Sequence, residues 1–127
     1  MKITFTNLEA ETFFHSALCN GLSQLNGYSV DVDYKKEDYA AAKKTLVEQP
    51  SNPCYEDVLL QILREGKELQ FVDEEGEDTK TILLADVHTK MSEVPAKFLI
   101  EMISENDDAD TADVILQTII YGDIIFG

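Results

Sequence analysis

Apolar residues recur along this chain with two different spacings. Over some segments they return every three or four positions, which is typical of a helix with one buried face. Over others they return every second position, which is typical of a strand with one face in water. The spacings, and the turn residues between them, predict helices at residues 7–26, 37–47, 54–64, 92–104 and 110–121, and strands at residues 2–5, 28–34, 69–72, 79–85 and 124–126.

Short-range signals support the ends of several predicted helices. Thr6 and Glu9 have the spacing of a capping box, so the first helix should start near Asn7. Gly27 is expected to take a positive φ as the cap that ends this helix, and Gly122 to do the same for the last one.

The C-terminal segment, residues 106–127, shows the sharpest change of character in the chain, from an acidic part to an apolar part. It begins with carboxylates that suit the first turn of a helix, where free N–H groups and the helix dipole favour negative charge. It continues as an apolar run that covers more than one helix face, so we expect this helix to be the most buried of the five. The run ends in Ile124, Ile125 and Phe126, which predict a last short strand.

Helices and strands are interspersed without regular alternation, which predicts an α+β fold of about five helices packed on a small, mainly antiparallel sheet. A chain of 127 residues fits one globular domain, residues 1–127, and is long enough to bury roughly two thirds of the surface that it exposes when unfolded. Its hydrophobic fraction of 44% is too high for a disordered chain.

The net charge of -15 narrows the range of partners. Residues 1–72 carry 11 acidic and 7 basic groups (-4), and residues 73–127 carry 14 and 3 (-11), so most of the excess lies in the second part. Such a charge opposes direct binding to nucleic acid and to an anionic membrane surface. It favours solubility and also steered encounter with a basic protein, and both explanations stay open.

The beginning of the chain and its cysteines suggest a compartment. The first residues hold no apolar core of a signal peptide, and no run approaches the ~18 apolar residues of a membrane span. Cys19 and Cys54 have no partner at short spacing, which suits a reducing compartment better than a disulfide framework. These features predict a cytoplasmic protein.

The clearest candidate for metal chemistry is a set of side chains spaced four apart. Glu11, His15 and Cys19 project from one side of the first predicted helix and could hold a divalent ion. Three ligands on one helix rarely close a tetrahedron, and His88 and Cys54 lie far away in sequence. The preferred interpretation is a small apolar cysteine beside a surface histidine, with no metal site.

Catalytic signals are equally weak. Cys54 with either histidine would supply a nucleophile and a base, but no local signature accompanies the pair. Asp31 with Asp33, and Asp108 with Asp110, are close carboxylate pairs of a kind that can hold Mg²⁺, although a solvated face explains them as well. We therefore predict no catalytic residue, no cofactor and no enzymatic activity.

The acidic segments at residues 73–78 and 106–113 look at first like calcium loops. The twelve-residue loop requires Gly at its sixth position and Glu at its twelfth, and neither segment has them. A turn and a helix start are the simpler explanations.

Two stretches near the C-terminus carry a family resemblance. Residues 112–117, ADVILQ, and 121–127, YGDIIFG, resemble the ends of a loose group of small, acidic, uncharacterised proteins of tailed bacteriophages, including crAss-like phages of gut bacteria. Residues 54–59, CYEDVL, extend the resemblance. It implies a phage or prophage origin, and hence the host cytoplasm or a virion, but assigns no activity to any residue.

Small acidic phage proteins often act by binding host proteins, so the resemblance implies host takeover through protein–protein interaction. The candidate surface for a basic partner consists of Asp73, Glu74, Glu75, Glu77, Asp78, Asp107, Asp108 and Asp110. One alternative is a structural or assembly component that forms a homo-oligomer through Ile124, Ile125 and Phe126. Another is a binder of a small signalling nucleotide, for which Lys35, Lys36, Lys43 and Lys44 would supply the positive charge.

Overall fold

The computed structural model describes residues 3–47, 52–75, 79–104 and 108–126. Its elements, in chain order, are α1 (Asn7–Gly27), β1 (Val30–Asp33), α2 (Lys36–Val47), α3 (Tyr55–Arg64), β2 (Leu69–Asp73), β3 (Thr79–Ile82), α4 (Leu84–Lys90), the 3-10 helix η1 (Met91–Glu93), α5 (Ala96–Ile103) and α6 (Ala109–Tyr121). The predicted α+β fold is confirmed, with six α-helices and a three-stranded antiparallel sheet in the described residues.

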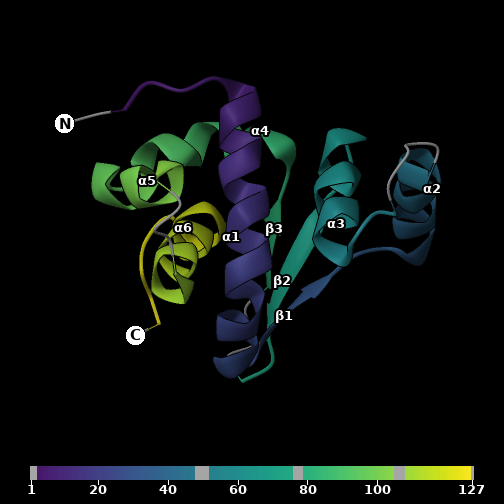
Figure 1. Cartoon of the computed structure of the whole chain (residues 1–127). Coiled ribbons are helices and arrows are strands. Elements are labelled where there is room, and N and C mark those ends of the chain that lie inside the picture. Colours follow the sequence, from purple (N-terminus) through teal and green to yellow (C-terminus); the bar gives the residue numbers. More distant parts are fainter. Residues whose placement is uncertain (1–2, 48–51, 76–78, 105–107, 127) are drawn as a thin grey trace.

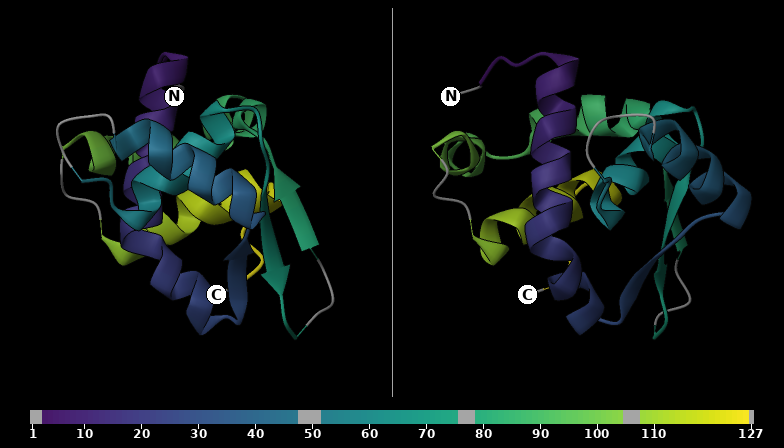
Figure 2. Two further views of the ribbon diagram at one scale, coloured as in Figure 1. Left: turned by 90° about the vertical axis from the view of Figure 1, so that its right-hand side faces the viewer. Right: turned by 45° about the vertical axis from the view of Figure 1, so that its right-hand side comes forward.

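The sheet has the order β1-β2-β3, and each strand is antiparallel to its neighbour. Val30 pairs with Asp73 at one end of the β1–β2 ladder, and Leu69 pairs with Ile82 in the β2–β3 ladder. Val30, Leu69 and Ile82 are buried, because the helices gather on their face of the sheet (Figures 1 and 2). The alternate positions are exposed or half-buried, as the two-residue periodicity predicted.

The core is built where α1 and α6 cross (Figure 1). A Cβ atom at Gly21 would lie 2.9 Å from Leu116 Cδ1 and 3.0 Å from the Cβ atom of Ala112, so glycine permits this close approach. Eight of the thirteen residues of α6 are buried, the largest fraction in any of the helices. The prediction that the last helix is the most buried one is confirmed.

Both predicted terminal strands are wrong within the described residues. Residues 3–6 form no strand; instead Phe5 packs edge-on against Phe13 of α1, with ring centroids 5.8 Å apart. At the other end, the backbone N–H groups of Ile125 and Phe126 donate to Oε1 of Gln117, at 2.8 and 2.9 Å. A buried side chain of α6 thus replaces the neighbouring strand that the C-terminal segment would need.

Two local predictions also need correction. The strand predicted at residues 79–85 ends at Ile82, and α4 follows at once, its start capped by a hydrogen bond from the backbone N–H of Leu83 to Asp86 (2.8 Å). The positive φ expected at Gly27 lies two residues later, at Ser29 (φ 64°). The caps at Thr6 and Gly122 form as predicted.

Candidate functional site

The two acidic segments start from different elements of the fold. Glu74 and Glu75 follow β2 and are exposed, and Asp73 is the last residue of that strand. Asp108 and Asp110 lie at the start of α6 and are also exposed. The other predicted members of this surface, Glu77, Asp78 and Asp107, lie outside the described residues.

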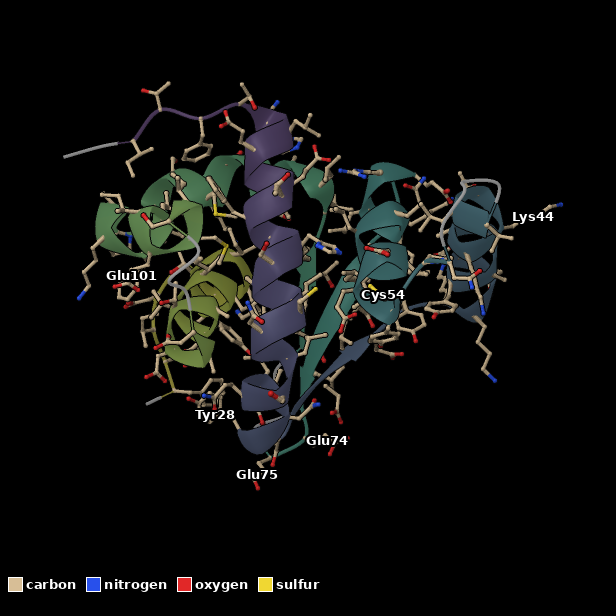
Figure 3. The ribbon with its side chains drawn as sticks, viewed as in Figure 1. Tyr28, Lys44, Cys54, Glu74, Glu75 and Glu101 are labelled. Carbon is tan, nitrogen blue, oxygen red and sulfur yellow. The ribbon has the colours of Figure 1, made fainter. Side chains whose placement is uncertain are left out.

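The corner that follows α1 brings these segments together. The hydroxyl of Tyr28 donates to Asp113 Oδ2 of α6 (3.1 Å), and the hydroxyl of the next residue, Ser29, donates to Glu75 Oε1 (3.2 Å). Figure 3 shows Tyr28, Glu74 and Glu75 at the same end of the molecule. Adjacent residues therefore bind carboxylates from segments that lie about forty residues apart in sequence.

Ser29 holds an unfavourable backbone conformation at this corner. Its φ of 64° lies in the left-handed region, which residues other than Gly, Asn and Asp seldom adopt. Its carbonyl oxygen accepts a hydrogen bond from the backbone N–H of Glu74 (3.0 Å), which ties the corner to the end of β2. The hydrogen bond from the residue that follows β2 thus helps to hold the conformation in which the Ser29 hydroxyl reaches Glu75.

Two carboxylates that were not predicted for this surface complete it. Asp31 of β1 lies so close to Glu74 that a shared hydrogen bond and like-charge repulsion raise the pKa of Glu74. Asp113 is the partner of Tyr28. Asp110 lies three residues before Asp113 on α6, and its charge also acts on the Tyr28 hydroxyl. We use the name acidic corner for Asp31, Glu74, Glu75, Asp110 and Asp113.

The charge of the acidic corner is not neutralised within the described part of the chain. The ion pairs found there join Glu11 to Arg64 and His88, and Asp57 to His15, and none involves a carboxylate of the acidic corner. A basic group that approached the corner would relieve the repulsion between Asp31 and Glu74.

Asp108 serves a different purpose from its neighbours. Its Oδ1 accepts a hydrogen bond from the backbone N–H of Thr111 (2.9 Å) as the N-cap of α6. This hydrogen bond lowers the pKa of Asp108. We therefore assign Asp108 to the start of the helix rather than to the acidic corner.

The predicted oligomer contact is divided between surface and interior. Ile124 and Ile125 are 44% and 55% exposed. Phe126 is half-buried, and its ring stacks on Tyr28 with centroids 5.0 Å apart. Within the C-terminal segment, Phe126 therefore packs against Tyr28 at the acidic corner, and the two isoleucines are exposed to solvent.

The candidate metal set on α1 separates in the structure. Glu11 is only 8% exposed, and its oxygens bind Arg64 Nε and His88 Nε2, each at 2.7 Å. Burial alone would raise the pKa of Glu11, but the hydrogen bonds from Arg64 and His88 outweigh it and hold this pKa below its ordinary value. Glu11 is thus engaged away from His15 and Cys19.

His15 is instead joined to the start of α3. Its Nε2 lies 2.6 Å from Asp57 Oδ1, while Asp57 Oδ2 accepts a hydrogen bond from the backbone N–H of Cys54 (2.9 Å). The donor atoms of His15, Cys54 and Asp57 all lie within 4.8 Å of one another. The sequence offered Cys54 with either histidine as a possible pair, but it did not indicate Asp57, because no local spacing links this residue to His15.

The cysteines of this region are poor nucleophiles. The Sγ atom of Cys19 lies 3.9 Å from His15 Nδ1, but burial and the negative groups of Glu56, Cys54 and Asp57 raise the pKa of Cys19 to about 11. Burial also raises the pKa of Cys54. Both thiols are therefore protonated near neutral pH, which is the wrong direction for thiolate catalysis.

The remaining candidates occupy separate places. Asp33 and Lys35 line a hollow of about 110 Å³ beside the sheet, whereas Lys43 and Lys44 lie on α2, and Figure 3 places Lys44 at the far edge of the molecule. Asp31 and Asp33 are both exposed on β1. The lysines predicted for a nucleotide are thus divided between two surfaces.

Comparisons with known proteins found no match to a family model, to a curated protein or to a solved structure. Among the described helices, none has the length and apolar character needed to cross a membrane.

Proposed function

We propose that this chain is a non-enzymatic interaction protein whose acidic corner binds a basic surface of another protein. The observation that carries the proposal is the pair of hydrogen bonds from Tyr28 and Ser29, which hold two distant acidic segments at one place. The carboxylates there are exposed or half-buried, and in the described residues they form no ion pair.

Physical chemistry favours a basic partner. A net charge of -15 accelerates encounter with a positively charged surface at low ionic strength. Tyr28 adds an aromatic ring at the same place, and aromatic side chains are enriched in binding surfaces. Fixing the carboxylates in advance also lowers the entropic cost of binding.

The biological setting of the proposal comes from the resemblance to small acidic proteins of tailed bacteriophages. In that setting the partner is a protein of the bacterial host, met in the host cytoplasm, and binding inhibits it. The acidic corner and the phage proteins that the chain resembles share one property, their acidity.

The experiment is capture from a bacterial lysate at low salt with two matched variants. The corner variant carries Glu74→Gln, Glu75→Gln and Asp110→Asn, and the control variant carries Glu37→Gln, Glu68→Gln and Glu93→Gln. Both have a net charge of -12, because each neutralises three of the carboxylates that give -15. The proposal expects a protein retained by the wild type and the control and lost by the corner variant; no captured protein, or equal loss from both variants, would contradict it.

A second candidate is a homo-oligomer formed through the C-terminal segment, and the exposure of Ile124 and Ile125 supports it. The contact would be apolar packing rather than strand pairing, because Gln117 already binds the backbone N–H groups of residues 125 and 126. Light scattering separates the two candidates: this one expects an oligomer in the wild type and a monomer in Ile124→Ser/Ile125→Ser.

A further inference from the structure

We propose that His15, Cys54 and Asp57 form a binding site for a divalent ion of the zinc class. The three side chains come from α1 and from the start of α3, and their donor atoms lie within 4.8 Å of one another. Metal–ligand bonds of 2.0–2.3 Å place the donors of a tetrahedral site about 3.3–3.8 Å apart. Side-chain movements of about 1 Å would therefore complete the coordination.

The identity of the donors selects the ion. One imidazole nitrogen, one sulfur and one carboxylate oxygen suit Zn²⁺, whereas Mg²⁺ and Ca²⁺ prefer oxygen donors throughout. Three protein ligands leave the fourth position to water, as in zinc sites that remain open.

The local charge also favours the ion. When Cys54 gives up its thiol proton, its thiolate and the Asp57 carboxylate carry two negative charges. These charges neutralise Zn²⁺, and the imidazole of His15 binds as a neutral ligand. Glu56, next to Asp57 on α3, adds further negative charge nearby. The start of α3 would repel a cation slightly, and because burial raises the pKa of Cys54, the bound ion itself has to displace the thiol proton.

Existing hydrogen bonds already orient the proposed ligands, as the partners of metal ligands do in zinc sites. Asp57 Oδ2 is held by the backbone N–H of Cys54, so Oδ1 is the oxygen that remains for the ion. His15 Nδ1 faces Cys19 Sγ at 3.9 Å, which leaves Nε2 directed at Asp57. The ion would replace the hydrogen bond between Nε2 and Oδ1, whose 2.6 Å is too short for two ligands of one zinc ion.

The test is titration of the reduced, metal-free full chain with Co²⁺, followed by displacement with Zn²⁺. The proposal expects one ion per chain and a thiolate-to-cobalt charge-transfer band that Zn²⁺ abolishes. Absence of the band in the wild type would overturn it.

Cys54→Ser is the most informative variant. Serine is a favourable N-cap, so the change should preserve α3 while removing the sulfur donor. The proposal expects loss of the charge-transfer band and at least about tenfold weaker Zn²⁺ binding, with an unchanged circular dichroism spectrum. Binding equal to that of the wild type would overturn it.

Two further variants keep the result specific. His15→Gln should weaken Zn²⁺ binding as strongly as Cys54→Ser, and it tests the site even if Cys54→Ser fails to fold. Cys19→Ser is the matched control, because it removes a thiol from the same surface without removing a proposed ligand. Equal loss of binding in Cys19→Ser would contradict the set of ligands proposed here.

Discussion

The molecule uses its carboxylates in two opposite ways. At the acidic corner, a hydrogen bond shared with Asp31 and the repulsion between the two carboxylates raise the pKa of Glu74 on open surface. In the seam between α1, α3 and α4, burial opposes the charged carboxylates, but hydrogen bonds outweigh it and lower both carboxyl pKa values. Glu11 is bound by Arg64 and His88, and Asp57 is bound by Cys54 and His15.

The difference separates acidic residues that stabilise the fold from those that are available to a partner. Folding favours the charged form of a carboxylate that is paired and hydrogen-bonded, whereas it disfavours the charged form of an exposed carboxylate beside another one. The same residue type thus has a structural role in the seam and a proposed binding role in the acidic corner.

The largest expected effect is on the seam. Glu11→Ala leaves Arg64 and His88 without their shared acceptor, so we expect the free energy of unfolding to fall by about 2 kcal/mol. Solvent screening limits this loss, because the Arg64 side chain is 38% exposed. Urea denaturation measures it, with Glu74→Ala as the control that should show no comparable loss; equal effects would remove the distinction between the two regions.

The pH dependence of stability should differ in sign between the regions. The pKa of Glu11 is lower in the folded chain, so its stabilisation is complete above its unfolded-state pKa of about 4.3 and is lost as the pH falls through the folded value. The wild type should therefore lose its advantage over Glu11→Gln in acid.

Glu74 provides the opposite case. Its folded-state pKa is raised, so the charged carboxylate opposes folding above that pKa, and protonation relieves the repulsion as the pH falls. Glu74→Gln should be the more stable protein near neutral pH and equal to the wild type in acid. Thermal unfolding across this pH range would show it, and parallel curves for the two variants would contradict the comparison.

A smaller effect separates the cap from its neighbour. Asp108→Ala removes the N-cap hydrogen bond to Thr111 and should lower Tm by roughly 4 °C. Asp110→Ala should lower Tm by less, because Asp110 of the first turn interacts with the helix dipole but no described hydrogen bond of its side chain caps the helix. Differential scanning calorimetry of both variants measures the contrast; a similar loss in Asp110→Ala would move that residue from the proposed binding surface to the helix start.

The smallest effect concerns the link between the acidic segments. Tyr28→Phe removes the hydrogen bond to Asp113 but retains the stacking on Phe126, so the cost should be about 0.5–1 kcal/mol. Tyr28→Ala also removes the ring and should cost more. Urea denaturation of both variants tests this order.

The sequence predicted those structural features that are determined by residues close together in the chain. The capping box of Thr6 and Glu9 and the glycine cap at Gly122 are contained within a few positions, and both form. The short helix α4 was missed, because the apolar run from Ile82 to Leu84 continues the strand pattern and only the cap at Asp86 signals a new element.

The contacts that define the two sites could not be predicted in this way. Tyr28 and Asp113 are 85 positions apart, and His15 and Asp57 are 42 apart. Such pairs depend on how α1 crosses α6 and packs on α3, which no spacing along the chain records. The sequence shows which segments are acidic, but it does not show where in the fold they meet.

The most direct test of the proposed binding surface is an NMR titration of the full chain with oligolysine at low salt. Binding at the acidic corner predicts that the largest amide shift changes lie at residues 28–31, 74–75 and 110–113, and that they disappear in the Glu74→Gln/Glu75→Gln/Asp110→Asn variant. Shift changes spread evenly over all acidic residues, or unchanged in that variant, would contradict the account.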